Sequence, residues 1–284
     1  MRSKLFVPGS RPELFAKALT SAADAVSFDL EDAVAKDRKA EARATLGAYL
    51  KTVPADSRKV IVVRVNAVDS EYFAADMEAV TGPSTPIINL PMVEDASAVK
   101  QAAQLLDRLD HGDRRTGLLV NIETPKSLRN AAALAGSDPR VIGLQIGYAD
   151  LLEPFGIARM DQAALAHIRL QVRLAAAEAG VAAYDGAYAL VKDPEGYRAE
   201  CEAARRHGFA GKSCIHPTQI EIANQAFMPT AAEIEKARRI VAASVDAEVR
   251  GVGAYLVDGQ MVDAPFLAGA RAVLALAEQE SANN

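Results

Sequence analysis

The sequence is poor in cysteine and lacks tryptophan: its 284 residues include only two cysteines, Cys201 and Cys214. With no second pair of cysteines, a disulfide framework and a cysteine-based metal motif are both excluded. The sequence also lacks any apolar run near the roughly 20 residues of a membrane span, and residues 1–12 contain no signal-peptide core. We therefore expect a cytoplasmic protein that does not contact membranes.

An excess of positive charge is missing as well. The sequence has 32 Lys and Arg against 37 Asp and Glu, a formal net charge of −5. Because a broad nucleic-acid surface needs a basic excess, no nucleic-acid partner is expected. Half of the residues are hydrophobic and 24% are charged, so the chain can bury a large core as one large domain or two ordinary ones.

Short apolar segments alternate along the chain with alanine-rich segments of helical character. Several of the former are almost continuously apolar, which is typical of parallel strands covered on both faces. Eight such strands, each followed by a helical segment, predict a (β/α)8 TIM barrel. The predicted strands are residues 4–7, 25–30, 60–65, 87–92, 118–123, 141–146, 182–187 and 211–216. The predicted helices include residues 12–22, 37–51, 96–109, 162–179 and 194–207.

An open doubly wound sheet would give the same alternation. That fold usually opens with a glycine-rich phosphate turn after its first strand. Here the turn reads Val7-Pro8-Gly9-Ser10-Arg11, which lacks the GxGxxG pattern. The barrel is therefore the favoured fold.

The chain continues beyond what one barrel needs, which predicts a barrel over residues 1–228 and an extension over residues 229–284. In the extension Thr230 is expected to cap a helix over residues 231–245. Asp258-Gly259 is a strong hairpin signal, and a last helix is predicted over residues 265–280. We expect this extension to act as a lid or an oligomerisation arm.

Charged and polar side chains stand near the carboxyl ends of the predicted strands, where such barrels carry their chemistry. These side chains are Asp29, Glu31, Asp32, Arg64, Asn66, Glu123, Asp150, Asp185 and His216. A charge at the end of a buried strand is costly unless it is paired or binds a metal. An ion-pair network closing the barrel mouth is the structural alternative. The excess of carboxylates favours a hard metal ion, and Glu123 with Asp150 is the best ligand pair for Mg²⁺.

Other barrel chemistries are less favoured by the sequence. A zinc site would need histidines and cysteines grouped closely, and the four histidines are scattered. A lysine Schiff base needs a lysine that faces a desolvated pocket. Lys4 and Lys212 stand at the beginning of their predicted strands, away from the expected catalytic end, so this chemistry is not expected.

Six segments are informative in combination: LFVPGSRPELFAKAL, ADAVSFDLEDAVAKDRKAEAR, VVRVNA, NIETPKSL, GFAGKSCIHPTQIEIANQAFMPTAAEIEKA and QMVDAPF. Together they resemble the citrate lyase β-subunit-like family. This family holds citryl, malyl and citramalyl thioester lyases within the HpcH/HpaI aldolase superfamily. The resemblance runs from Arg2 to about Leu267, and the order DLEDAV, arginine strand, IET and GKxxIHPxQ is far more specific than any one of these motifs.

The resemblance implies Mg²⁺ bound by Glu123 and Asp150, with Arg64 holding the carboxylate or carbonyl oxygens of the substrate. It also implies that Asp263 reaches the site of a neighbouring subunit as an acid or base. Family members are commonly trimers, so the resemblance implies a homotrimer.

The acidic motif of the family, near the metal and its waters, matches Asp29, Glu31 and Asp32. Glu31 is a further catalytic candidate, and Asp29 and Asp32 are candidates for substrate binding. His216 is a candidate for substrate binding or for ordering the barrel mouth; its alternative role is packing at the turn before Pro217.

Two departures from the family pattern bear on the substrate. Met92 stands where the family often has lysine, and Tyr148-Ala149 precede Asp150 where an acidic or asparagine residue is common. The leading expectation is a Mg²⁺-dependent lyase that splits a 3-hydroxy-carboxylate thioester into a 2-oxo acid, such as oxaloacetate, and an acyl thioester. Arg64 would stabilise the enolate and Asp263 would move the proton at its carbon.

Alternative functions remain open at this stage. The same metal site could serve an aldolase or a thioesterase, and assays of the products would separate these from a lyase. The chain could instead be a carrier-protein-dependent subunit of a citrate lyase complex. Turnover of a free coenzyme A thioester, rather than an acyl-carrier-protein thioester, would discriminate between an independent enzyme and such a subunit.

Overall fold

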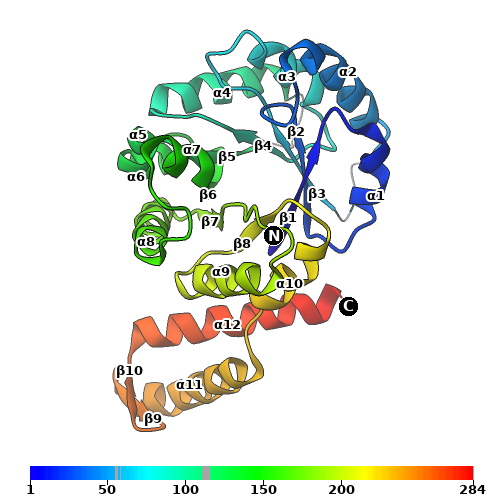
Figure 1. Ribbon diagram of the computed structural model, residues 1–284. Helices are drawn as coiled ribbons and strands as arrows, with labels where there is room; N and C mark the ends of the chain where they lie inside the picture. Colours follow the sequence, from blue (N-terminus) through cyan, green and yellow to red (C-terminus); the bar gives the residue numbers. More distant parts are fainter. Residues whose placement is uncertain (55–56, 58, 111–115, 284) are drawn as a thin grey trace. The chain divides into compact units, whose positions relative to one another are not determined.

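The computed structural model describes residues 1–54, 57, 59–110 and 116–283 (Figure 1). The chain divides into two compact units, Met1–Phe227 and Met228–Asn284. The predicted division, after residue 228, lies one residue further along the chain. In the part of the chain that the structure describes, no helix is both long and apolar enough to cross a lipid bilayer.

Eight parallel strands form a closed barrel in the first unit, in the order of the sequence from β1 to β8. Ser3 to Leu5 of the first strand pair with Lys212 to Cys214 of the last, which closes the barrel. The predicted (β/α)8 fold is therefore confirmed, and the open sheet is excluded. The strands are β1 (Ser3–Pro8), β2 (Ala25–Asp29), β3 (Val60–Arg64), β4 (Ile87–Leu90), β5 (Gly117–Ile122), β6 (Val141–Ile146), β7 (Ala182–Asp185) and β8 (Gly211–Cys214).

Helices surround the barrel and cover its outer face (Figure 1). They are η1 (Pro12–Leu14), α1 (Phe15–Leu19), η2 (Lys36–Arg38), α2 (Lys39–Leu50), α3 (Phe73–Val80), α4 (Ala96–Leu109), α5 (Pro125–Arg129), α6 (Ala131–Ala135), α7 (Tyr148–Leu152), η3 (Glu153–Phe155), α8 (Gln162–Glu178), α9 (Pro194–Arg206) and α10 (Thr218–Ala226). The helix predicted over residues 12–22 is instead two short pieces, η1 and α1. Three of the other predicted helices match to within one residue at either end.

Six strands end earlier than predicted; β2, β3 and β5 do so by one residue, and β4, β7 and β8 by two. β4 stops at Leu90 because Pro91 has no N–H to continue the ladder and Met92 has a left-handed backbone, with φ +53°. β8 stops at Cys214, where the N–H of Ile215 donates to the side chain of Gln219 at 2.8 Å. β7 ends at residue 185 rather than 187.

The barrel interior is apolar at one level and polar at another. Five buried apolar side chains pack together inside the barrel: Ala25, Val62, Ile87, Leu119 and Tyr184. Barrels of this kind are usually filled with branched apolar residues. Here several further buried residues are polar: Lys4, Ser27, Asn89, Asn121, Gln145 and Ser213.

Both cysteines are free and lie buried in the first unit. Burial raises the pKa of the Cys201 thiol to about 12 and that of the Cys214 thiol to about 11. Tyr197 packs beside them, with its hydroxyl 3.1 Å from the sulfur of Cys214. Both thiols are therefore structural, in agreement with the absence of a cysteine-based motif.

The second unit is built from two helices and a hairpin: α11 (Ala231–Val249), β9 (Tyr255–Val257), β10 (Gln260–Val262) and α12 (Ala264–Asn283). Thr230 caps α11 in a capping box with Glu233, as the sequence predicts, although the helix runs four residues further. Asp258 and Gly259 have φ of +51° and +76°, the backbone of a tight two-residue hairpin.

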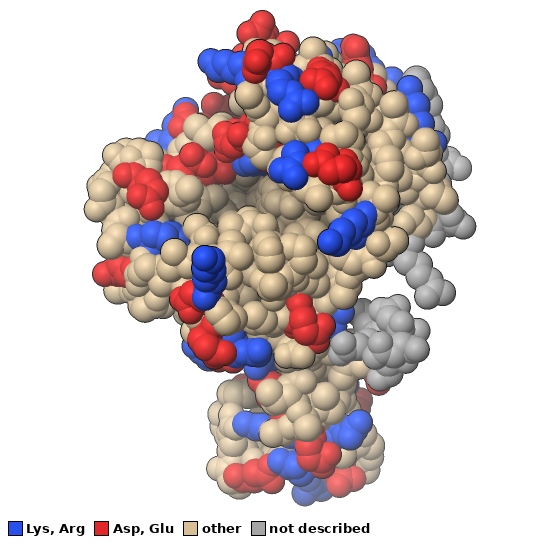
Figure 2. Space-filling view, turned by 45° about the vertical axis from the view of Figure 1, so that its right-hand side comes forward, with Lys and Arg blue, Asp and Glu red and all other residues tan. Residues whose placement is uncertain are grey.

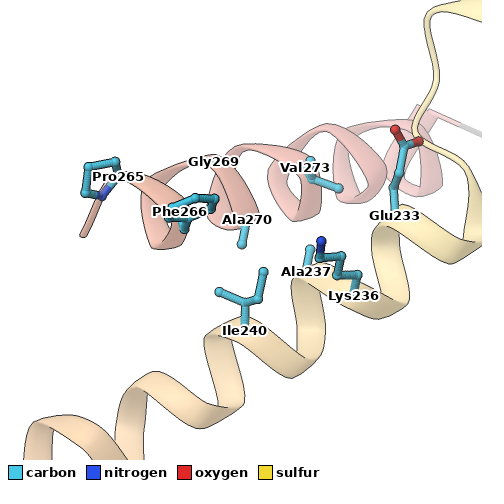
Figure 3. Close-up of a pocket in the computed structure, with 9 residues that line it drawn as sticks. All are labelled: Glu233, Lys236, Ala237, Ile240, Pro265, Phe266, Gly269, Ala270 and Val273. Carbon is cyan, nitrogen blue, oxygen red and sulfur yellow. The ribbon is translucent and has the colours of Figure 1, made fainter. Parts of the chain in front are cut away.

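The two helices of the second unit pack around a small apolar core of Ala237, Ile240, Val257, Val262 and Ala270. A groove of about 450 Å³ lies between α11 and α12 (Figure 3). Its walls are mostly apolar, and Glu233 and Lys236 stand among the lining side chains. The unit therefore has a core of its own.

The contact between α2 and α3 gives a test of the packing. A Cβ added at Gly47 in α2 would lie 2.7 Å from the carbonyl oxygen of Ala79 in α3. Although alanine favours a helix by about 1 kcal/mol over glycine, we expect Gly47→Ala to lower the free energy of unfolding by about 1–3 kcal/mol, the scale of overpacking. Gly269→Ala in α12 is the matched control, because no atom lies within 4 Å of its added Cβ. Denaturant unfolding of both variants measures the effect, and a stabilised Gly47→Ala protein would contradict it.

Candidate functional site

The register of β2 and β3 places Asp29 beside Arg64 at the carboxyl ends of the two strands. Arg64 donates from Nε to Oδ1 of Asp29 at 2.8 Å and from Nη2 to Oδ2 at 2.6 Å. Asp29, only 2% exposed, also accepts hydrogen bonds from the N–H groups of Glu31 and Ala33. This bidentate pair therefore fixes both the guanidinium and the turn that follows β2.

The remaining nitrogen of Arg64 faces the other two carboxylates of that turn. Nη1 lies 2.7 Å from Oε2 of Glu31 and 3.3 Å from Oδ2 of Asp32. Burial alone would lower the pKa of Arg64, but the hydrogen bonds and charges of Asp29, Glu31 and Asp32 raise it above its ordinary value. The guanidinium therefore stays charged. Its Nη1 faces Glu31 and Asp32, whose side chains are more exposed than that of Asp29.

Glu123 follows β5 and is 2% exposed. Its Oε1 accepts the N–H of Met92 at 2.6 Å, and its Oε2 accepts Nδ2 of Asn121 at 2.9 Å. The carboxylate lies against Gly147, where an added Cβ would be 2.3 Å from Oε2. Burial raises the pKa of Glu123 to about 7, and the charge of Asp150 adds to this rise.

Asp150 lies on α7, one strand further round the barrel. Burial and the charge of Asp32 raise its pKa, while Arg64 opposes the rise. Asp150 therefore shares one electrostatic environment with Asp32, Arg64 and Glu123. Of the nine residues that the sequence selected, the structure brings together six from the ends of four strands: Asp29, Glu31, Asp32, Arg64, Glu123 and Asp150.

Glu31 completes this group. Burial raises its pKa to about 8, opposed by Arg64 and reinforced by Asp32 and Glu123. A carboxyl group with this pKa holds its proton for most of the time at neutral pH, so it can serve as an acid as well as a base.

Negative charge is in excess at this mouth. Within the described residues neither Glu123 nor Asp150 has an ion-pair partner, while Arg64 is shared among Asp29, Glu31 and Asp32. Burial and, to a smaller extent, neighbouring negative charges raise the pKa values of these two carboxyls, and a bound cation would oppose both effects.

The donor set also fits one kind of cation. No group of three or more His, Cys, Asp or Glu side chains among the described residues forms a ready metal cage. Mg²⁺ suits such a site, because it is commonly bound through one or two carboxylates and keeps several waters. Figure 2 shows a face of the molecule that is hollowed, with acidic and basic side chains interspersed around it.

Lys4 stands at the start of its strand, as predicted, but its side chain reaches further than the sequence indicates. The residue is 2% exposed, and its amine donates to Oε1 of Gln145 inside the barrel. Gln145 in turn donates to Asn121, which donates to Glu123. Burial and the charge of Arg64 lower the pKa of Lys4 to about 7. Its position at the start of a strand is therefore no argument against a place near the site.

Lys39 is a second residue that the sequence did not single out. Its amine, almost fully buried, donates to the carbonyl oxygens of Leu30 and Glu31, each at 3.0 Å, and to the side chain of Asn66. Lys39 therefore connects the acidic turn after β2 to Asn66, which follows β3. The sequence does contain one signal for Lys39: it follows the acidic turn closely and is the first residue of the next helix, α2.

Two further residues that the sequence selected are His216, in the barrel unit, and Asp263, in the second unit. His216 is exposed, and its Nδ1 lies 2.8 Å from the hydroxyl of Thr218 at the start of α10. Asp263 lies between β10 and α12 in the second unit, and its Oδ1 is buried without a hydrogen-bond partner among the described residues. The hydrogen bond that would make Asp263 a helix cap is thus not formed by this oxygen.

Comparison with known proteins gives consistent matches over nearly the whole chain. A profile of the HpcH/HpaI aldolase/citrate lyase family matches residues 2–217. A (3S)-malyl-CoA thioesterase of Cereibacter sphaeroides is 42% identical over 278 residues, covering 98% of this chain and 94% of the relative. The citrate lyase subunit beta of Haemophilus influenzae is 34% identical, covering 96% of this chain and 95% of the relative.

A solved structure gives a similar result. The crystal structure of CitE from Mycobacterium tuberculosis, in complex with magnesium, acetoacetate and coenzyme A, superposes with a TM-score of 0.80. It is 34% identical and covers 98% of this chain and 100% of that chain. A second structure from the same organism is a citrate lyase beta subunit complexed with oxaloacetate and magnesium, with 32% identity over 80% of this chain and 97% of its own, and a TM-score of 0.69.

The left-handed backbone of Met92 gives a prediction about the site. A non-glycine residue at positive φ costs roughly 1–2 kcal/mol, and the side chain of Met92 is 45% exposed. We expect Met92→Gly to raise the free energy of unfolding by up to about 1 kcal/mol, because glycine adopts this backbone freely and keeps the N–H that holds Glu123. Met92→Ala retains the strain and is the control. Denaturant titrations measure both, and equal stabilities in the two variants would contradict the prediction.

Proposed function

Because this chain belongs to the HpcH/HpaI aldolase/citrate lyase family, we propose that it is a Mg²⁺-dependent carbon–carbon lyase acting on a 3-hydroxy-carboxylate thioester. The proposed products of cleavage are a 2-oxo acid and an acyl thioester, and the same site would serve the condensation direction. The observation that carries the proposal is the convergence of Glu123, Asp150 and the acidic turn after β2 around Arg64 at the barrel mouth.

The carrier of the acyl group is proposed to be coenzyme A. The M. tuberculosis relative was solved with coenzyme A and acetoacetate, and the C. sphaeroides relative is named for a coenzyme A thioester. The relatives from citrate lyase complexes keep an acyl-carrier-protein thioester open as the alternative substrate. Activity of the isolated chain on free coenzyme A thioesters tests the choice of carrier.

Glu123 and Asp150 are the residues that would hold Mg²⁺. When bound, the ion supplies a positive charge that polarises substrate oxygens. The chain contributes the rest: the N–H of Met92 and the side chain of Asn121 each hold one oxygen of Glu123, so the carboxylate keeps one orientation.

Arg64 is proposed to bind the substrate through Nη1, since its other two nitrogens are held by Asp29. A charge developing on a thioester oxygen would then meet a guanidinium that is already in place. In this proposal the substrate displaces Glu31 and Asp32 from Nη1 of Arg64. Asp29 positions Arg64, and the raised pKa of Glu31 suits a proton donor beside the reacting atoms.

Asp263 is proposed as the acid or base at the carbon next to the thioester. Its buried Oδ1 makes no hydrogen bond within the described residues, and a buried polar oxygen left unpaired is costly unless it has another role. We keep two proposals with it: that the chain is a homotrimer, and that Asp263 acts in the site of a neighbouring subunit. His216 is proposed to order the barrel mouth through its contact with Thr218.

Hydrolysis is the second candidate function. The observation that favours it is the identity to the (3S)-malyl-CoA thioesterase of C. sphaeroides, 42% against 34% for citrate lyase subunits. A thioesterase would use the same carboxylates and arginine on the same class of substrate. Product analysis separates the two, because a lyase releases a 2-oxo acid and a thioesterase releases the free hydroxy acid with a free thiol.

The metal site is tested by removing one charge at a time. We expect Glu123→Gln and Asp150→Asn each to abolish Mg²⁺-dependent turnover of malyl and citramalyl coenzyme A, because each change removes a ligand charge while nearly preserving shape. Glu202→Gln, an exposed change on α9, is the matched control and should keep full activity. Turnover is followed by 2-oxo acid formation and thiol release, and normal rates in either ligand variant would refute the assignment.

Asp263→Asn tests the second unit. Asparagine keeps the shape of aspartate but cannot exchange a proton, so we expect a folded protein with activity reduced by roughly 10²-fold. Mixing Asp263→Asn with Glu123→Gln protein should partly restore activity if sites are shared between subunits. Full activity of Asp263→Asn would leave the residue without a chemical role. No recovery after verified subunit exchange would assign the aspartate to its own barrel.

A further inference from the structure

A cluster of buried charges lies behind the barrel wall, outside the site described above. It joins Asp185 of β7, Lys212 of β8, Arg169 of α8 and Glu200 of α9, each at most 3% exposed. Lys212 Nζ lies 2.7 Å from Asp185 and 2.9 Å from Glu200, and Arg169 lies 3.1 Å from Asp185. Arg159, in the loop before α8, forms an ion pair with Glu200 at 2.7 Å. Such a cluster holds its members in fixed positions, because breaking any one pair strands a buried charge.

Tyr148 connects this cluster to α7. Its hydroxyl donates to Oδ1 of Asp185 at 2.6 Å, and its ring is 2% exposed. The guanidinium of Arg159 stacks over the ring at 4.4 Å from the centroid. On the β7 side a Cβ added at Gly186 would lie 2.7 Å from the ring, so the ring occupies space that only glycine leaves free. Burial and the charge of Asp185 raise the pKa of Tyr148 well above its ordinary value, so the hydroxyl remains a donor.

Tyr148 is also the first residue of α7, and Asp150 is the third. The helix has five residues and no side-chain hydrogen bond at its N-cap, and Tyr148 is the buried residue of its first turn. A displacement of the Tyr148 ring would move Asp150 with it, because only one residue separates them on the same turn of helix.

We propose that Tyr148 is a positioning residue, whose hydrogen bond to Asp185 fixes Asp150 on α7 for metal binding at the barrel mouth. This inference rests on the proposed Mg²⁺ site and extends it to residues behind the barrel wall. The buried cluster then has a purpose beyond closing the barrel between β7 and β8: it sets where one metal ligand stands.

Tyr148→Phe is the variant that isolates the hydrogen bond. It keeps the ring and its contact with Arg159, and Oδ1 of Asp185 still accepts from Nε of Arg169 at 3.2 Å. The cluster should therefore stay intact and the protein should fold. Tyr188→Phe is the matched control, since Tyr188 is 1% exposed and its hydroxyl donates to Asp193, the residue that caps α9.

The measurement is the affinity of the purified chain for Mn²⁺, by the EPR signal of the free ion, and for Mg²⁺ by competition. We expect Tyr148→Phe to weaken Mg²⁺ binding by about 10-fold or more. Changes of this size are typical when a hydrogen bond that orients a metal ligand is removed. Tyr188→Phe should bind as the unchanged protein does. A purely structural role would lower the unfolding midpoint of Tyr148→Phe and leave its Mg²⁺ affinity unaltered.

Equal Mg²⁺ affinity in Tyr148→Phe and the unchanged protein would overturn the inference, and so would an equal loss in both tyrosine variants. Glu123→Gln is measured in parallel to separate this outcome from a failure of the proposed function. If Glu123→Gln loses metal binding while Tyr148→Phe keeps it, the site stands and only the positioning role is wrong. If Glu123→Gln binds metal as well as the unchanged protein, the proposed site is wrong and the inference falls with it.

Discussion

The pairing of Arg64 with Asp29 is the contact on which the geometry of the barrel mouth depends. The two are register partners on adjacent strands, so the parallel sheet itself brings them together. Asp29 then holds the turn that presents Glu31 and Asp32 to the last nitrogen of the guanidinium. One cation is thereby shared among three carboxylates, and the carboxylates after β5 and on α7 have no ion-pair partner among the residues that the structure describes. This imbalance of charge, rather than any one residue, is what makes the mouth suited to a metal ion.

The backbone does as much as side chains to place Glu123. An N–H at a left-handed residue, Met92, holds one oxygen, and Asn121 holds the other. Gly147 leaves the space that the carboxylate occupies. Burying a charge is expensive unless it is hydrogen-bonded, and here these donors partly offset that cost while burial still raises the pKa to about 7. The carboxyl is thus fixed in place, which suits the proposed role of Glu123 as a metal ligand.

The sequence predicts the features that depend on local patterns. Alternating apolar and helical segments predict the barrel, and Asp258-Gly259 predicts the hairpin, because both signals lie within short windows. The convergence at the mouth is predictable since parallel strands end at one edge. Three features are not predictable in this way. They are the hydrogen bond from the N–H of Met92 to Glu123, the inward direction of the Lys4 side chain, and the hydrogen bond from Tyr148 to Asp185. Each depends on register or rotamer between segments far apart in the chain, which periodicity does not contain.

The burial of the two cysteines has a practical consequence for labelling the chain. Thiolates, not thiols, react with maleimides and related probes, and burial raises the pKa of Cys201 to about 12 and that of Cys214 to about 11. A cysteine introduced at exposed Leu256 in the second unit, or at exposed Leu174 on α8, should therefore be labelled well ahead of the native thiols. Either position can therefore carry a label without first removing the cysteines that pack the barrel.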